Sequence, residues 1–193
     1  LLITGVRRAG KSTLLLQLMK ENQENSLFLN FEDPRLAGFE LSDFQKLDKI
    51  IKNKKVKNLF FDEIQIFEGW EMYVRQKLDE GFKVAVTGSN ASLMSREMGT
   101  KLTGRNLPYE LFPFSYSEFL EFKNLENNSE SAHKYLYDGG FPEFLNLENG
   151  LVLQRLLVDV LNRDIAVRYG VRDVNSLHQL AVYLISNIGK PVS

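Results

Sequence analysis

The 193-residue sequence contains no cysteine and only two histidines. The absence of cysteine excludes a disulfide framework, thiolate metal ligands and a cysteine nucleophile, and two histidines make a zinc site unexpected. No apolar run reaches the roughly 18 residues that a membrane-spanning helix needs. Neither charge is in excess, because 24 Lys and Arg stand against 25 Asp and Glu, which excludes a strongly basic arm or an acidic tail. We therefore expect a soluble, cytoplasmic globular protein with no membrane partner.

Short apolar runs alternate with helical periods from residue 1 to about residue 122, a pattern typical of a parallel sheet flanked by helices. Five of these runs are predicted to be strands: Leu1–Thr4, Leu27–Phe31, Leu59–Phe61, Val84–Thr87 and Leu107–Leu111. Ser42 with Gln45, and Ser115 with Glu118, have the spacing of capping boxes and predict two helix starts. The pattern indicates an α/β core domain over residues 1–124.

A polar stretch at residues 125–131 follows this core and is the best candidate for a linker. Beyond it, apolar residues recur at helical spacing, which predicts a small all-helical domain over residues 129–193. The sequence begins without Met inside a strand pattern, and its last helical pattern breaks at Gly189, close to the end. We expect both domains to be truncated.

A glycine-rich segment at residues 5–13 fits the phosphate-binding pattern G-x-x-x-x-G-K-[ST] and lies between a predicted strand and a predicted helix. Glycines let backbone amides turn toward phosphate, and the following helix presents its positive end to the same group. Lys11 is expected to reach the β- and γ-phosphates, and the Ser12 hydroxyl to bind Mg²⁺. The alternative is an ordinary glycine turn with a surface lysine. The expected nucleotide-binding residues of this segment are Gly5, Val6, Arg7, Arg8, Ala9, Gly10, Lys11, Ser12 and Thr13.

Two carboxylates, Asp62 and Glu63, directly follow an apolar strand. Parallel sheets collect ligand-binding groups at the carboxyl ends of their strands, so Asp62 is expected beside the phosphate-binding loop. Asp62 suits a magnesium site, as in a Walker B element, and Glu63 could act as a general base on an attacking water. The alternative is a pair of solvated acids after a strand.

Two further polar residues lie near the ends of later strands. Asn90 could hydrogen-bond the γ-phosphate or its water, and the alternative is a Gly-Ser-Asn turn that caps the next helix. Arg105 could stabilise developing phosphoryl charge within its own subunit or across an interface, and the alternative is an ordinary surface arginine.

With these motifs in this order, the sequence resembles the AAA+ ATPases, and within them the prokaryotic archaeal-type group related to the STAND ATPases. The strings that carry the resemblance are GVRRAGKST (5–13), FDEIQ (61–65), TGSN (87–90), TGR (103–105), PFSYSEF (113–119) and GGFP (139–142). It implies a three-layer α/β/α P-loop NTPase fold with a mostly parallel five-stranded sheet of order 5-1-4-3-2, followed by a helical or winged-helix lid. It also implies binding of ATP or ADP with Mg²⁺.

The resemblance assigns three individual positions. Asn90 matches the sensor-1 position and Arg105 an arginine-finger position, while Pro142 matches a lid proline that packs near adenine. The alternative for Pro142 is a simple Gly-Pro turn between helices. Proteins of this group usually continue past the lid into a further domain, which could hold a nucleic-acid or protein partner; action of Arg105 across an interface would require a homo-oligomer.

The leading hypothesis is an ATPase that uses Mg²⁺ and moves its lid against its core. Lys11, Glu63, Asn90 and Arg105 are the expected catalytic residues, and Ser12 and Asp62 the expected metal ligands. One alternative is a nucleotide-gated binding switch with negligible turnover. Another is a small-molecule kinase, which the Asp62–Glu63 pair disfavours because a water-activating carboxylate suits hydrolysis better than transfer to an acceptor.

Overall fold

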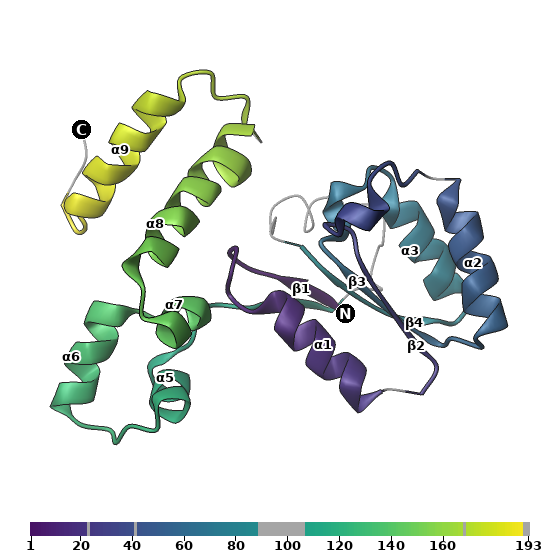
Figure 1. Cartoon of the computed structure of the whole chain (residues 1–193), viewed down its shortest axis with the longest axis horizontal. Helices are drawn as coiled ribbons and strands as arrows, with labels where there is room; N and C mark the ends of the chain where they lie inside the picture. The colour runs from purple at the N-terminus through teal and green to yellow at the C-terminus, as the bar shows by residue number, and fades with distance from the viewer. Residues whose placement is uncertain (23, 41, 89–106, 168, 191–193) are drawn as a thin grey trace. The chain divides into compact units, whose positions relative to one another are not determined.

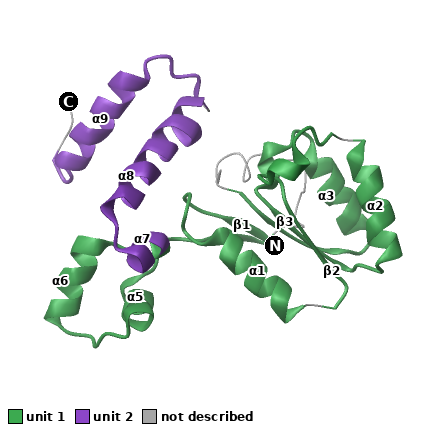
Figure 2. Ribbon diagram, in the orientation of Figure 1, with its two compact units in different colours: residues 1–142 green, residues 143–193 purple. Residues whose placement is uncertain are grey.

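The computed structural model describes residues 1–22, 24–40, 42–88, 107–167 and 169–190 (Figure 1). They form two compact units, Leu1–Pro142 and Glu143–Ser193, shown separately coloured in Figure 2. The division of the chain into a core over 1–124 and a lid over 129–193 remains a prediction. Asn90 and Arg105 lie outside the described residues.

The first unit contains a five-stranded sheet. Its strands are β1 (Leu2–Thr4), β2 (Ser26–Asn30), β3 (Asn58–Asp62), β4 (Lys83–Thr87) and β5 (Pro108–Glu110). Their order is β2-β3-β4-β1-β5, with parallel pairing between all neighbours, which confirms the predicted order read from the opposite edge. Because Phe61 pairs with Val86, the next residues, Asp62 and Thr87, lie at the same edge of the sheet.

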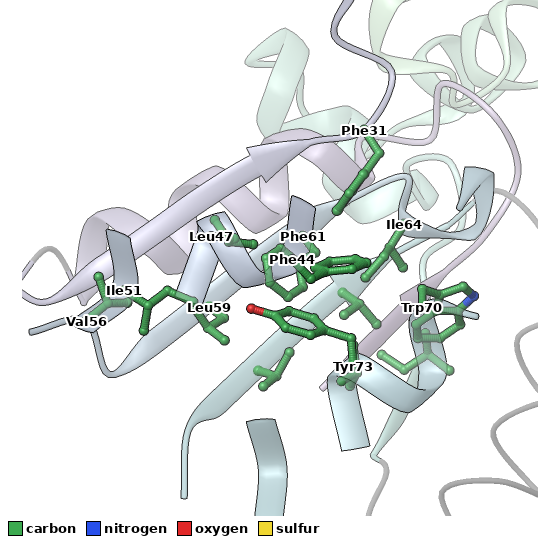
Figure 3. Close-up of a cluster of buried hydrophobic side chains, with 14 residues drawn as sticks. Phe31, Phe44, Leu47, Ile51, Val56, Leu59, Phe61, Ile64, Trp70 and Tyr73 are labelled. Carbon is green, nitrogen blue, oxygen red and sulfur yellow. The ribbon is translucent and has the colours of Figure 1, made fainter. Parts of the chain in front are cut away.

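Helices cover both faces of this sheet. They are α1 (Lys11–Glu21), α2 (Asp43–Asn53) and α3 (Trp70–Asp79). The short 3-10 helices η1 (Pro34–Leu36) and η2 (Ile64–Ile66) lie between β2 and α2 and between β3 and α3. Because side chains alternate along a strand, Phe60 faces α1 and packs in a cluster with Leu15. Phe61 faces the opposite way, into a larger cluster with residues of α2 and α3 (Figure 3). The core is therefore a three-layer α/β/α sandwich, as predicted.

The larger cluster is rich in aromatic side chains. Phe44 stacks on Tyr73 with ring centroids 4.0 Å apart, and Phe31 lies edge-on to Phe61 at 5.9 Å (Figure 3). Offset and edge-on ring pairs of this kind add about 0.5–1.5 kcal/mol each beyond the area they bury. These contacts hold α2 and α3 on the sheet face opposite the phosphate-binding loop's helix.

The two predicted capping boxes have different outcomes. Ser115 and Glu118 form theirs at the start of α5 (Tyr116–Lys123), where the Ser115 amide donates to Glu118 Oε2 at 2.8 Å. Ser42 makes no side-chain cap bond, because its own backbone is already helical and an N-cap residue must be extended. Instead, Asp43 Oδ2 accepts from the Glu40 amide at 2.9 Å.

Helices complete the described chain after the sheet. The first unit also contains α6 (Ser129–Asp138), and α7 (Pro142–Leu147) begins at the division between the units. The second unit contains α8 (Gly150–Asp159), a π-helical segment at Val160–Val167 and α9 (Val174–Ser186). The predicted helical character of this region is confirmed. Within the described ranges, no helix is both long and apolar enough to cross a bilayer.

Candidate functional site

The phosphate-binding loop connects β1 to α1, and the two glycines of its G-x-x-x-x-G-K-[ST] pattern are needed for different reasons. Gly5 has φ +138°, and a Cβ at this position would lie 2.1 Å from the carbonyl oxygen of Leu111. Gly10 has φ +100°, and a Cβ there would make only an ordinary contact with Leu111 Cδ2 at 4.0 Å, so glycine is favoured here by the left-handed backbone at the helix start. Glycine at these positions lets the loop approach the backbone of Leu111, the residue after β5, and turn into α1.

The helix that follows the loop has the electrostatics of an anion site. Helix α1 begins at Lys11, and no acidic residue occupies its first turn. The first amides of a helix have no partner within it, and they carry the positive end of the helix dipole. A phosphate at this helix start would be attracted by both effects.

Lys11 is buried within the loop. Its Nζ donates to the carbonyl oxygens of Gly5 at 3.0 Å and Val6 at 3.1 Å, and only 4% of the residue is exposed. An ammonium carries three donors that can be redirected. The structure thus places the predicted phosphate-binding lysine inside the loop that it is predicted to serve.

Ser12 and Asp62 come together as predicted for a magnesium site. Ser12 Oγ donates to Asp62 Oδ1 at 3.0 Å, and Asp62 lies at the end of β3 with 2% exposure. Two hard oxygen atoms at one place suit Mg²⁺, which is held by few protein ligands together with substrate phosphates and water. The described parts of the chain contain no group of three or more His, Cys, Asp or Glu side chains that could hold a metal ion.

Glu63 leaves β3 in an unusual conformation. Its φ and ψ are 50° and 40°, in the left-handed region that a non-glycine residue seldom adopts. Its amide donates to Thr87 Oγ1 at 3.0 Å, and its Oε2 accepts from Gln65 Nε2 at 2.5 Å. The strand therefore ends at Asp62, and Gln65, two residues after Glu63, donates to the Glu63 carboxylate.

The sequence reasoning missed two residues of this site, Thr87 and Gln65. Thr87 Oγ1 donates to Asp62 Oδ1 at 2.5 Å, so one carboxylate oxygen accepts from hydroxyls of both α1 and β4. The rule that parallel strands collect their ligand groups at one edge points to Thr87 as well as to Asp62. No pattern indicates Gln65, because its contact depends on the turn at Glu63.

The remaining predicted residues lie as follows. Arg7 forms an ion pair with Glu32 at 3.6 Å, and Arg8 has a left-handed backbone with φ 64°. Ala9 is buried, and Thr13 is exposed on α1. Pro142 is the first residue of α7.

The Gly-Gly-Phe-Pro element before α7 makes a tight backbone contact within the first unit. The Phe114 amide donates to the Gly140 carbonyl at 2.8 Å, and a Cβ on Gly140 would lie 2.1 Å from the Phe114 oxygen. The hydroxyl of Tyr135 donates to that same oxygen at 2.8 Å. Gly140 is thus required for close packing against the segment that leads into α5.

Comparison with known proteins identifies the family. A family model described as an AAA domain matches residues 1–120, and the chain belongs to this family. The match confirms the resemblance to AAA+ ATPases of the archaeal type drawn from the sequence motifs.

Two curated relatives match over almost the whole chain. The uncharacterized protein MJ1544 of Methanocaldococcus jannaschii is 36% identical over 208 residues, which cover 99% of this chain and 47% of the relative. An uncharacterized protein of Haemophilus influenzae is 35% identical over 208 residues, covering 99% and 52%. The chain therefore spans about half the length of these relatives. Among solved structures, the replication initiator DnaA bound to AMPPCP and single-stranded DNA matches with a TM-score of 0.47 and 15% identity, covering 100% of this chain and 65% of that one.

Proposed function

We propose that this AAA-family protein binds ATP with Mg²⁺ at the loop between β1 and α1 and hydrolyses it to drive a conformational change between its core and its helical region. The observation that carries the proposal is the pairing of Ser12 Oγ with Asp62 Oδ1 at 3.0 Å beside the buried Lys11. These three side chains supply the metal-binding oxygens and the cation that phosphoryl transfer needs.

In this proposal the loop amides and Lys11 neutralise the phosphate charge. Ser12 and Asp62 would hold Mg²⁺, which when bound neutralises charge on the β- and γ-phosphates. Glu63 would accept a hydrogen bond from the attacking water and orient it. For this, the Glu63 carboxylate must share or release its contact with Gln65.

The proposal also includes the roles predicted from the sequence for Asn90, Arg105 and Pro142. Asn90 would hydrogen-bond the γ-phosphate or the water, Arg105 would stabilise the developing charge, and Pro142 would pack near the adenine ring. If Arg105 acts across an interface, the protein works as a homo-oligomer. Any nucleic-acid or protein partner would bind through parts of the whole protein beyond this chain.

The test is ATP turnover and nucleotide binding by the whole protein that contains this chain, and by its variants. Lys11→Ala removes the phosphate-binding ammonium and is expected to weaken both, while Glu63→Gln should retain binding and lose turnover. Lys20→Ala, in the last turn of α1, is the matched control and should behave as the wild type. Equal turnover in the wild type, Lys11→Ala and Glu63→Gln would reject the assignment. A rise of specific activity with protein concentration is expected if Arg105 acts in trans, and a flat dependence would contradict that role.

The second candidate function is a nucleotide-gated switch with negligible turnover. The contact of Gln65 Nε2 with Glu63 Oε2 at 2.5 Å favours it, because this hydrogen bond occupies one acceptor site of the carboxylate and restrains its orientation. Gln65→Ala separates the two functions. An increase in turnover on this substitution would indicate that Gln65 restrains Glu63, whereas tight binding with no turnover in either protein would favour a switch. The exposed Gln17→Ala on α1 serves as the control.

A further inference from the structure

Thr87, the last residue of β4, has a side chain that joins both acidic residues of the site. The residue is 0% exposed, donates from Oγ1 to Asp62 Oδ1 at 2.5 Å and accepts at Oγ1 from the Glu63 amide at 3.0 Å. A threonine hydroxyl has one proton and two lone pairs. The hydroxyl proton goes to the Asp62 carboxylate, and a lone pair accepts the Glu63 amide. One oxygen atom therefore holds the last residue of β3 and the residue that follows it.

The contact with Asp62 limits how that carboxylate can be used. Ser12 and Thr87 both donate to Oδ1, and together they tie the carboxylate to α1 on one side and β4 on the other. A carboxylate that binds metal is oriented by such hydrogen bonds from neighbouring side chains. Without the Thr87 hydroxyl, the Asp62 carboxylate would keep, among its contacts with the described residues, the hydrogen bond from Ser12, and that hydroxyl must itself turn toward the metal.

The contact with Glu63 supports a backbone that is unfavourable by itself. The left-handed conformation costs an L-residue free energy, and a buried amide without an acceptor would add to that cost. The Thr87 oxygen supplies the acceptor at this amide. It thereby stabilises the turn that sets the direction of the Glu63 side chain.

We infer that Thr87 is a positioning residue, which holds Asp62 for Mg²⁺ and holds the backbone of Glu63 for the attacking water. This inference rests on the proposed function of the site. Thr87 contacts neither nucleotide nor water in this role; it acts through the two residues that do.

The experiment replaces the hydroxyl while keeping the shape of the side chain. Thr87→Val removes both hydrogen bonds, and Thr87→Ser retains both without the methyl group. Binding of a fluorescent ATP analogue is titrated with Mg²⁺ and with EDTA, and turnover is measured as a function of Mg²⁺ concentration. Val84→Ala, also buried in β4, is the control for loss of packing; it should lower the melting temperature and leave the Mg²⁺ dependence unchanged.

Thr87→Val is expected to bind the ATP analogue in EDTA about as well as the wild type, and to bind it more weakly in Mg²⁺. Its turnover should fall by about 10–100-fold, the usual effect of losing a group that orients a metal ligand. Thr87→Ser should restore both quantities. A folded Thr87→Val protein with unchanged Mg²⁺ dependence and turnover would overturn this inference alone. The same Mg²⁺-specific loss in Val84→Ala would also overturn it, because packing would then suffice. Absence of saturable nucleotide binding in the wild type would instead overturn the proposed function, and this inference with it.

Discussion

Gly5→Ala tests whether the phosphate-binding loop depends on its close approach to the backbone of Leu111, the residue after β5. The added Cβ would lie 2.1 Å from the Leu111 carbonyl oxygen, far inside van der Waals contact, and φ at this position is +138°. Leu111 is fixed by its own backbone, since its amide donates to the Thr4 carbonyl at 2.8 Å. The obstacle is therefore main chain, which cannot rotate away as a side chain could.

The expected loss of stability follows from two separate costs. A non-glycine residue at such a φ costs about 1–3 kcal/mol, and overpacking in a well-packed region costs about 1–3 kcal/mol more. The sum, about 2–6 kcal/mol, is a large part of the 5–15 kcal/mol that typically stabilises a domain. For a chain of this length we expect a fall in melting temperature of about 5–20 °C, together with weaker nucleotide binding.

Gly38→Ala is the matched control. Gly38 also has a positive φ, +81°, but no atom lies within 4 Å of the Cβ position. It should therefore show only the backbone cost, about 1–3 kcal/mol, and leave nucleotide binding unchanged. Both variants are compared by thermal unfolding and by ATP titration. If Gly5→Ala is no less stable than Gly38→Ala, the argument from close approach is refuted.

Two further predictions concern the core. Leu15 is fully buried against the sheet, and Leu16 is 37% exposed on the same helix. Leu15→Ala should lower the free energy of unfolding, measured in urea, by about 2–5 kcal/mol, and Leu16→Ala by much less. Equal losses would contradict the assigned buried face of α1. Burial, and then the hydrogen bond to Asp48, raise the pKa of Tyr73 well above its ordinary value. Since the unfolded tyrosine loses its proton first, this contribution to stability is present below about pH 10 and is lost as the pH rises further. Above about pH 10 the free energy of unfolding should therefore fall less steeply with pH in Tyr73→Phe than in the wild type. An identical fall in both proteins would exclude Tyr73 as its cause.

The sheet and much of the site could be predicted because they depend on local patterns. The five apolar runs became the five strands, and the glycine-rich pattern placed Lys11 and Ser12 at the start of a helix. The position of Asp62 followed from the general behaviour of parallel strands. Each of these signals lies within a few residues of the feature that it indicates.

The features that the sequence did not reveal depend on backbone conformation or on exposure. The left-handed turn at Glu63 brings Gln65 to the carboxylate, and no residue preference indicates a glutamate there. Ile50 belongs to an apolar stripe with buried residues of α2, yet it is 44% exposed. The π-helical segment at Val160–Val167 changes the spacing of side chains on which a regular helical stripe relies.

The strand order determines when, during synthesis, the strand that leads into the phosphate-binding loop can pair with both of its neighbours. Strand β1 lies between β4 and β5, so Ile3 pairs with Thr87 on one side and with Tyr109 on the other. At the usual ribosomal rate of roughly 5–20 residues per second, about 5–20 s pass between the emergence of the loop and that of its last neighbour. Until β4 emerges the nascent chain carries an apolar β1 without a partner, and until β5 emerges one edge of β1 stays unpaired. A chaperone that shields this segment should raise the yield of folded protein.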